Sequence, residues 1–454
     1  MMASAGHPDP MTTLELDIER PAFGGAGLAR HEGRVVFVEG GLPGSRVAAR
    51  VTKEERNSLR AVAVRVLAPS PQACPPFCPH FGPCGGCTWQ DAAYPAQLEW
   101  KRQIVAEQLK RLAGLEVPVE ETTASPLERG YRNKMEFAFA PGDPFRLGLR
   151  ERFAPGRVLE VSACGLMHEP AMAILEAARR LAAATQLPPY FARTGSGAWR
   201  HLVLRRSEAS GEWLAQFIVG PTAPVKRLRS LGEALLAEFP ALTGVVMDVR
   251  RDRADYAIGE RRAWTLGQDA LTETLDGLAF SVSAGSFFQT NTRAAALLYA
   301  RAVEAARLEG GEQVWDLYCG VGGLSLFLAR RAGSVTGFEL SQEAVADAAD
   351  NAARNGLVNC AFQAGDLKDA LARRKARPDV IVLDPPRAGL HPDSAQALTR
   401  LGAPRMVYVS CNASTMARDL GRLAQAYHVE QVTPVDLFPH TPHIECVAEL
   451  RARG

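Results

Sequence analysis

The sequence predicts an α/β protein whose C-terminal part, residues 271–454, contains a parallel sheet with helices on both faces. One observation behind this prediction is that short apolar runs alternate with helix-like segments from residue 313 onward. Another is that several of these runs end in carboxylates or turn-forming residues, as buried strands of parallel sheets do. By contrast, residues 1–70 hold short strand-like runs between glycine-rich turns, which is typical of a small antiparallel barrel.

The predicted barrel begins after a loose tail, residues 1–10. Its strand-like runs cover residues 13–18, 34–38, 45–52 and 60–67, with glycine-rich turns at 24–27 and 40–44. Small barrels of this kind often bind single-stranded nucleic acid. A barrel that only packs against its neighbours is the alternative, and the local charge does not decide between the two.

Composition limits the class of protein. The chain has 454 residues, 47% of them apolar and 22% charged, which suits two to four globular domains. The net charge of +2 neither requires nor excludes nucleic-acid binding. No apolar run reaches the roughly 18 residues of a membrane span, and the N-terminus has no signal-peptide pattern. We therefore expect a cytoplasmic protein without a membrane partner, and expect it to be a monomer.

Four of the nine cysteines are crowded between Cys74 and Cys87. Cys78, Cys84 and Cys87 lie in a loop rich in proline and glycine, and Cys84 and Cys87 form a C-x2-C pair. A crowded cysteine loop is more typical of a metal site in a reducing compartment than of disulfides. The next cysteine, Cys164, can supply a fourth thiolate, which suits either zinc or a [4Fe–4S] cluster. Cys74 is surplus, and His80 is a possible competing ligand.

Residues 71–270 read as a central α+β domain. Helices are predicted at 94–113 and 170–184, and strands at 131–139 and 200–206. Basic residues outnumber acidic ones between 129 and 157, and Arg132 and Lys134 belong to this excess. Such a surface can contact phosphates, although a solvated strand face is the alternative.

The glycine-rich turn after residues 313–317 indicates a ligand site. A dinucleotide site requires G-x-G-x-x-G, whereas Gly320 begins G-V-G-G here. Asp316 before the turn suits a positively charged amine, and Glu339 at the end of the next strand suits a ribose diol. An amine and a ribose without a diphosphate describe S-adenosylmethionine. A glycine turn without a ligand is the alternative.

Three more polar residues lie beside predicted strands. Asp384 ends one strand in the sequence Asp-Pro-Pro-Arg, and Cys411 follows the buried strand 406–409. Glu445 begins the last apolar run. Because chemistry collects at the carboxyl ends of parallel strands, Cys411 is a candidate nucleophile and Glu445 a candidate general base. The alternatives are a core cysteine, a structural aspartate and a surface glutamate.

Together these motifs resemble the RNA uracil-5 methyltransferases, especially the 23S ribosomal RNA branch with an N-terminal TRAM domain and a [4Fe–4S] cluster. The resemblance covers nearly the whole chain. It rests on the glycine-rich phrases at 23–47, the cysteine loop, Ser-Phe-Phe-Gln-Thr-Asn at 286–291, Asp-Leu-Tyr-Cys-Gly at 316–320, Asp-Pro-Pro-Arg at 384–387, Ser-Cys-Asn at 410–412 and Glu445. It implies a Rossmann-like class I methyltransferase fold for residues 271–454, behind a TRAM barrel at 1–70 and a cluster-carrying central domain at 71–270.

The resemblance also implies residue roles. Cys411 would add to uracil C6, Glu445 would remove the C5 proton, and Arg132 and Lys134 would contact RNA. The cofactor-binding residues would be Gln289, Asp316, Tyr318, Gly320, Glu339, Asp366 and Asp384. The cluster ligands would be Cys78, Cys84, Cys87 and Cys164.

Two positions depart from the family pattern. Ala413 stands where the family usually has proline, and Gly323 where many relatives have asparagine. We expect a looser loop at the first and one missing cofactor contact at the second. The expected substrate is 23S ribosomal RNA, with the T-loop of transfer RNA as the alternative. Two other classes compete: a methyltransferase acting on protein or small molecules, and a metal-stabilised RNA-binding protein with a decayed catalytic domain.

Overall fold

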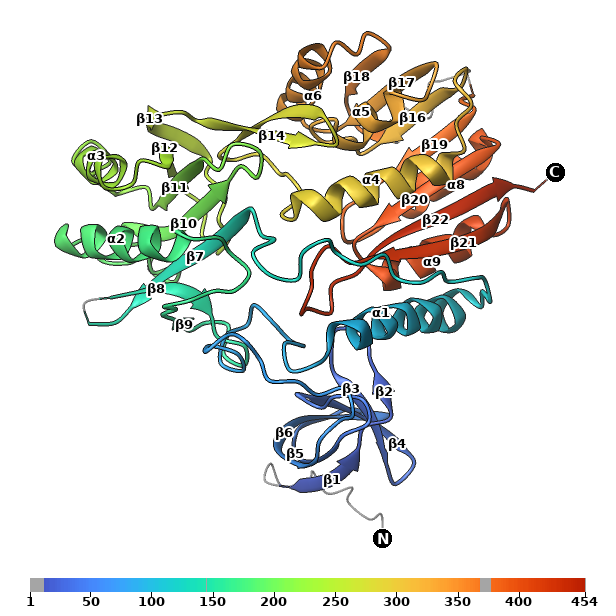
Figure 1. The fold of residues 1–454 in the computed structure, drawn as a ribbon, viewed down its shortest axis with the longest axis horizontal. Helices are drawn as coiled ribbons and strands as arrows, with labels where there is room; N and C mark the ends of the chain where they lie inside the picture. Colours follow the sequence, from blue (N-terminus) through green and yellow to red (C-terminus); the bar gives the residue numbers. More distant parts are fainter. Residues whose placement is uncertain (1–11, 144, 368–376, 454) are drawn as a thin grey trace.

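The computed structural model describes residues 12–143, 145–367 and 377–453, so the predicted tail at 1–10 lies outside the described residues. The chain forms three larger sheets in sequence order, shown from blue through green to red in Figure 1. The first sheet projects below the other two in this view. Within the described residues, helices are all too short or too polar to cross a membrane.

The first sheet has the strand order β1-β5-β6-β4-β3-β2. Alternate residues such as Leu16, Val36 and Val47 are buried in its interior, as the period of two in a strand requires. Most pairs are antiparallel, as predicted, but β4 and β6 pair in parallel. The strands are β1 (Thr13–Asp17), β2 (Arg20–Pro21), β3 (Gly27–His31), β4 (Arg34–Glu39), β5 (Arg46–Glu54) and β6 (Ser58–Ala68).

The second sheet has the order β13-β12-β11-β10-β7-β8-β9, with only β11 and β12 parallel among its described pairs. Helices α2 (Ala171–Ala184) and α3 (Arg229–Glu238) pack on it through a core that includes Trp199 and Phe217. A hairpin of β14 (Ala270–Leu275) and β15 (Leu278–Ser283) follows. The sheet strands are β7 (Lys134–Pro141), β8 (Phe145–Arg150), β9 (Val158–Leu159), β10 (Trp199–Arg206), β11 (Trp213–Val219), β12 (Leu242–Val249) and β13 (Arg261–Gly267).

The third sheet has the order β18-β17-β16-β19-β20-β22-β21. Its strands are parallel from β18 to β20, as predicted, whereas β22 is antiparallel to both of its neighbours. The strands are β16 (Gln313–Leu317), β17 (Ser334–Glu339), β18 (Cys360–Ala364), β19 (Val380–Leu383), β20 (Arg405–Ser410), β21 (Tyr427–Val435) and β22 (Glu445–Ala452).

Helices cover both faces of this third sheet. Trp315 and Tyr408 point into one hydrophobic core, while their neighbours Val314 and Val407 point into the other. This alternation places helices on the two faces, and it confirms the predicted α/β layering. The helices are α4 (Thr292–Ala306), α5 (Gly323–Ala329), α6 (Gln342–Arg354), α8 (Pro392–Leu401) and α9 (Ala413–Leu423).

Helix α1 (Tyr94–Gln108), continued by a π-helical turn at Leu109–Ala113, lies beside the third sheet (Figure 1). Trp100 and Ile104 of α1 share a core with Tyr408 and Leu420. The segment that follows the cysteine loop therefore packs on the C-terminal sheet.

Candidate functional site

A cleft of about 1390 Å³ opens at the carboxyl ends of the parallel strands of the third sheet. It brings together most of the residues that the sequence singled out, from segments more than a hundred residues apart. Those that line it are Arg132, Gln289, Asp316, Tyr318, Gly320, Glu339, Asp384, Cys411 and Glu445. Among the predicted cofactor residues, Asp366 is exposed and does not line this cleft.

Strand pairing places Cys411 beside Glu445. Strands β20 and β22 are antiparallel, and Ser410 pairs with Cys446 at the end of the ladder. One step further along, Cys411 and Glu445 are the next opposing residues at the mouth of the cleft. Glu445 is 5% exposed and Cys411 is half-buried, so the carboxyl is the more deeply buried of the two groups.

Burial and nearby carboxylates set the protonation of these two groups. Burial, followed by the charges of Glu445 and Asp384, raises the pKa of Cys411 to about 11, and Arg387 partly offsets this. Burial and the charge of Asp384 also raise the pKa of Glu445 well above its usual range. A carboxyl with a raised pKa is a better proton acceptor near neutral pH than an exposed one.

The turn that carries Cys411 is held in place by its own polar residues. Asn412 caps α9 by accepting hydrogen bonds from the amides of Ser414 and Thr415. Its side-chain amide also donates to the carbonyl oxygen of Arg387 at 3.2 Å, which ties this turn to the Asp-Pro-Pro-Arg turn. Ala413 is the first residue of α9, a position that also suits proline.

Asp316 ends β16 as a buried carboxylate with one unsatisfied oxygen. Its Oδ2 accepts a hydrogen bond from Ser325, but Oδ1 has no partner among the described residues. Burial raises the pKa of Asp316 to about 7. A cationic amine at this position would satisfy Oδ1 and favour the charged form, so the site fits the ammonium group of S-adenosylmethionine.

The glycine turn next to Asp316 leaves space for a ligand. Gly320 has φ 53° and nothing lies within 4 Å of where its Cβ would be. The carboxylate of Glu339 accepts hydrogen bonds from the amides of Gly320 and Ser341, at 3.2 and 2.9 Å. These bonds fix the carboxylate, and its remaining lone pairs can accept ribose hydroxyls.

Some residues that line the cleft were not predicted as site residues from the sequence. Tyr299 of α4 is buried in the cleft, and burial followed by the charges of Asp384 and Asp316 raises its pKa. A Cβ at Gly323 would lie 2.8 Å from the Tyr299 hydroxyl, so glycine there accommodates this ring. No sequence motif marks Tyr299 as a site residue, because it lies on an ordinary amphipathic helix. Arg387, Phe438 and His443 also line the cleft.

The four predicted cluster ligands surround a second cavity of about 600 Å³. The amide of Gly86 donates to the sulfur of Cys84 at 3.4 Å, and Gln90 donates to that of Cys87 at 3.1 Å. Hydrogen bonds of this kind favour a charged sulfur. However, the described residues include no group of three or more His, Cys, Asp or Glu side chains placed to hold a metal ion.

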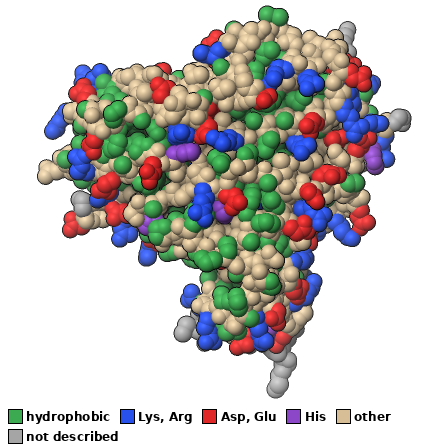
Figure 2. Space-filling model, viewed as in Figure 1, with side chains coloured by type: hydrophobic (Ala, Val, Ile, Leu, Met, Phe, Trp, Pro, Cys, Tyr) green, Lys and Arg blue, Asp and Glu red, His purple; other side chains and the backbone are tan. Residues whose placement is uncertain are grey.

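The two predicted RNA-contacting residues lie near the junction of the two cavities. Arg132 lines both cavities, and its guanidinium lies 5.9 Å from the ring centre of Phe438. Lys134 lines only the cysteine cavity and pairs with Glu136 at 2.8 Å. On the face shown in Figure 2, basic and acidic side chains are intermixed. Charge on this face therefore does not mark one broad nucleic-acid surface.

Comparison with known proteins matches this geometry. The profile of the tRNA (uracil-5-)-methyltransferase family matches residues 258–453, and that of the TRAM domain matches residues 10–64. An uncharacterized RNA methyltransferase of Nitratidesulfovibrio vulgaris is 43% identical to this chain, with 96% of each chain covered. The chain belongs to the RNA uracil-5 methyltransferase family.

A second relative and a solved structure support the assignment of this RNA methyltransferase to its family. An uncharacterized RNA methyltransferase of Clostridium tetani is 35% identical, with 97% of each chain covered. The Pyrococcus abyssi tRNA (uracil-54, C5)-methyltransferase, solved in complex with S-adenosyl-L-homocysteine, has a TM-score of 0.76 and 27% identity, covering 96% of this chain and 100% of that one. The predicted TRAM domain and the predicted class of enzyme, an S-adenosylmethionine-dependent RNA methyltransferase, are confirmed.

Proposed function

We propose that this methyltransferase converts uridine to 5-methyluridine in 23S ribosomal RNA through a covalent bond between Cys411 and the base. The observation that carries the mechanism is the juxtaposition of Cys411 and Glu445 at the ends of β20 and β22, beside the cleft that fits S-adenosylmethionine. Uracil C5 is a weak nucleophile, and covalent catalysis divides one difficult step into easier ones.

In this mechanism the Cys411 thiolate forms a bond to C6, and the C5–C6 π electrons move into an enolate. When bound, S-adenosylmethionine would supply an electrophilic methyl group. C5 forms a bond to this methyl carbon as the bond from that carbon to sulfur breaks, which leaves S-adenosylhomocysteine. Glu445 then removes the C5 proton, the C5–C6 double bond forms again, and the bond to the Cys411 sulfur breaks. Asp384, which lines the same cleft, contacts either the uracil edge or the methyl donor. The target base must leave its stack to reach Cys411.

We assign the remaining roles by position. Asp316 holds the amine of the methyl donor and Glu339 its ribose, with Gln289, Tyr318 and Gly320 lining the same cleft. Asp366 stays a proposed cofactor residue that acts at the edge, close enough for its charge to contribute to the raised pKa of Tyr318, which is caused mainly by burial. Arg132 and Lys134 are the proposed RNA contacts.

Transfer RNA is the second candidate substrate. The P. abyssi enzyme, which shares its fold with this chain over nearly the whole length, is a tRNA (uracil-54, C5)-methyltransferase. The assay that tests both candidates incubates the protein with labelled S-adenosylmethionine and unmodified 23S ribosomal RNA or transfer RNA. We expect 5-methyluridine, identified by mass after digestion, from ribosomal RNA. Product from transfer RNA alone would overturn the choice of substrate, and no 5-methyluridine from either would overturn the reaction.

We further propose that Cys78, Cys84, Cys87 and Cys164 hold a [4Fe–4S] cluster with a structural role. All four line one cavity, and two of their sulfurs accept hydrogen bonds. In a four-iron cluster each thiolate binds a different iron, so the sulfurs lie farther apart than around a single zinc ion. The cluster would tie the loop that contains Cys78, Cys84 and Cys87 to the segment around Cys164.

The cluster predicts a measurable iron content. Protein purified without oxygen should be brown and contain about four iron and four sulfide per chain, as a cluster with four cysteine ligands requires. Cys87→Ser should lose most of this iron, whereas Cys74→Ser should keep it, because Cys74 is not among the residues that line the cavity. Colourless protein containing zinc, or protein with no metal, would contradict the proposal.

We also propose the broader organisation that the sequence predicts. Three domains at 1–70, 71–270 and 271–454 would act as a monomer in the cytoplasm. The support is the order of the three sheets along the chain and the role of RNA as substrate.

A further inference from the structure

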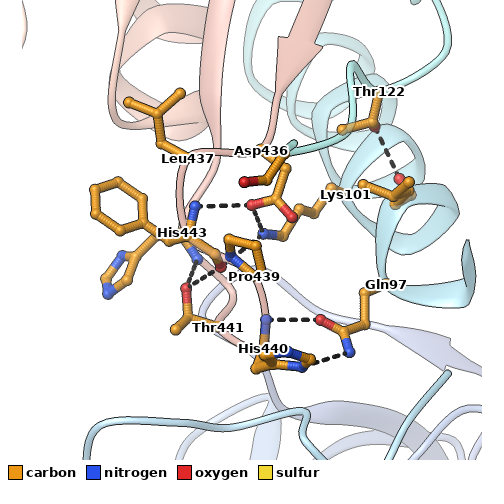
Figure 3. Close-up of polar contacts among 12 residues, drawn as sticks. Gln97, Lys101, Thr122, Asp436, Leu437, Pro439, His440, Thr441 and His443 are labelled. Carbon is orange, nitrogen blue, oxygen red and sulfur yellow. Dashed lines mark hydrogen bonds and ion pairs between the residues drawn. The ribbon is translucent and has the colours of Figure 1, made fainter. Parts of the chain in front are cut away.

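A buried ion pair lies outside the catalytic cleft. Lys101 of α1 and Asp436, which follows β21, are both 0% exposed, and Nζ donates to Oδ1 at 2.6 Å (Figure 3). Burying two charges carries a large desolvation cost, and apolar residues of similar size often stabilise a fold as well or better. Stability alone therefore does not explain why this ion pair is buried here.

The ion pair fixes the turn that leaves β21. Oδ1 of Asp436 also accepts the amide of Phe438 at 2.9 Å, and Lys101 Nζ also donates to the carbonyl of Phe438 at 3.2 Å. The other oxygen of Asp436 accepts the hydroxyl of Tyr94 at 2.9 Å. Three of these hydrogen bonds hold residues 436–438 against α1, and the fourth, from the Phe438 amide to Asp436, closes the turn itself.

His440 anchors the same segment a second time. Its amide donates to Gln97 Oε1 at 2.8 Å, and its Nδ1 faces the Gln97 amide nitrogen at 3.2 Å (Figure 3). The carbonyl oxygen of Glu128, 3.1 Å from Nε2, can only accept a hydrogen bond, and the amide nitrogen of Gln97 can only donate one. The ring proton is therefore on Nε2, which donates it to Glu128. The carbonyl of His440 accepts the amides of Thr88 and Trp89, next to Cys87.

The anchored segment, residues 436–443, leads directly to the proposed base. Phe438 and His443 line the catalytic cleft with Glu445, and their rings pack edge to face, 5.7 Å apart. Thr441 links the two ends, since its hydroxyl donates to the carbonyl of Phe438 and accepts the amide of His443. A shift at Asp436 would therefore pass through these hydrogen bonds to His443, and from there along two residues of backbone to Glu445.

We propose that Lys101 and Asp436 form a positioning pair that fixes residues 436–443, and through them the carboxylate of Glu445, for removal of the C5 proton. The inference rests on the proposed role of Glu445. Neither residue of the pair lines the cleft. The pair acts through the segment, and the charge of Lys101 also partly offsets the raised pKa of Glu445, which is caused mainly by burial. The segment that the pair fixes also contains His440, whose carbonyl accepts the amides of Thr88 and Trp89 beside the cysteine loop.

The positioning role predicts a defect in one chemical step. Lys101→Met keeps most of the length of the side chain and removes its charge. We expect turnover on uridine RNA to fall about ten- to a hundred-fold, because a misplaced catalytic group loses this much. A denaturant-resistant complex of protein and methylated RNA should accumulate, since proton removal releases the enzyme. The affinity for S-adenosylmethionine, measured by calorimetry, should stay unchanged.

RNA that contains 5-fluorouridine separates positioning from general damage. After methyl transfer its C5 carries fluorine in place of the proton, so the covalent complex forms without any work by Glu445. Lys101→Met should form this complex at the wild-type rate. The matched control is Arg102→Met, also on α1, whose partner is Glu99 and which should behave as wild type in every assay.

A second variant covers the case in which an unpaired buried charge unfolds the protein. Lys101→Met with Asp436→Leu removes both charges, and we expect it to fold yet keep the slow release. Wild-type release by either variant, or slowing of the fluorinated complex together with loss of S-adenosylmethionine binding, would overturn the positioning role. Failure of the wild-type enzyme to form a fluorinated complex would instead overturn the proposed covalent mechanism.

Discussion

Replacing Cys411 with alanine is expected to lower the rate of uridine methylation at least about ten-thousand-fold, because loss of a covalent nucleophile removes the pathway itself. The variant should still bind S-adenosylmethionine, since the sites that fit its amine and ribose, Asp316 and Glu339, lie on other strands of the sheet. The measurement is the rate of 5-methyluridine formation under single-turnover conditions, with calorimetry of the methyl donor alongside.

A cysteine outside the cleft, Cys360, provides the matched control for this variant. Cys360 lies on β18 outside the cleft and is half-buried like Cys411, so Cys360→Ala should methylate normally. Cys411→Ala should also form no denaturant-resistant complex with RNA that contains 5-fluorouridine. A Cys411→Ala protein that methylates at the wild-type rate would exclude the covalent mechanism.

The pH dependence of the wild-type rate tests the same thiol. Burial and the charges of Glu445 and Asp384 raise the pKa of Cys411 to about 11, so only a small fraction is thiolate at neutral pH. Below that pKa the thiolate fraction grows about tenfold per pH unit. When addition to C6 limits the rate, methylation should therefore rise steeply with pH and fall in acid, where the carboxylates are also protonated.

The sequence predicted many of the residues that line the cleft, because these residues lie at or next to the ends of predicted strands. Asp316, Asp384 and Cys411 each end or follow a predicted parallel strand, and parallel strands deliver their carboxyl ends to one edge of a sheet. Glu445 reached the same edge by a different route, as the first residue of an antiparallel strand. Its place beside Cys411 depends on the register of β20 and β22, which local patterns do not specify.

Long-range contacts explain what the sequence did not show. Lys101 and Asp436 are 335 residues apart, and each alone reads as an ordinary surface charge. Tyr299 has no neighbouring motif, and its contact with the position of Gly323 depends on how α4 packs against α5. The parallel pairing of β4 and β6 also follows from closure of the sheet rather than from the alternation that identifies its strands.

Replacing Glu445 with glutamine should stop the reaction after methyl transfer. Glutamine keeps the shape of the side chain but cannot accept the C5 proton, and loss of a general base costs about a hundred- to ten-thousand-fold in turnover. Cys411 and the methyl donor remain, so addition and methylation should proceed once. The expected product is a covalent complex, stable in denaturant, that contains protein, RNA and one labelled methyl group.

A control on the same strand isolates the effect of this carboxyl. Glu449 of β22 accepts hydrogen bonds from Arg307 and Gln431 away from the cleft, so Glu449→Gln should turn over normally. Removal of the Glu445 charge should also lower the pKa of Cys411, because that carboxylate raises it. The Glu445→Gln complex should therefore form at least as fast as the wild-type intermediate at neutral pH. A trapped complex without the methyl label would mean that Glu445 acts before methyl transfer, and turnover at the wild-type rate would exclude it as the base.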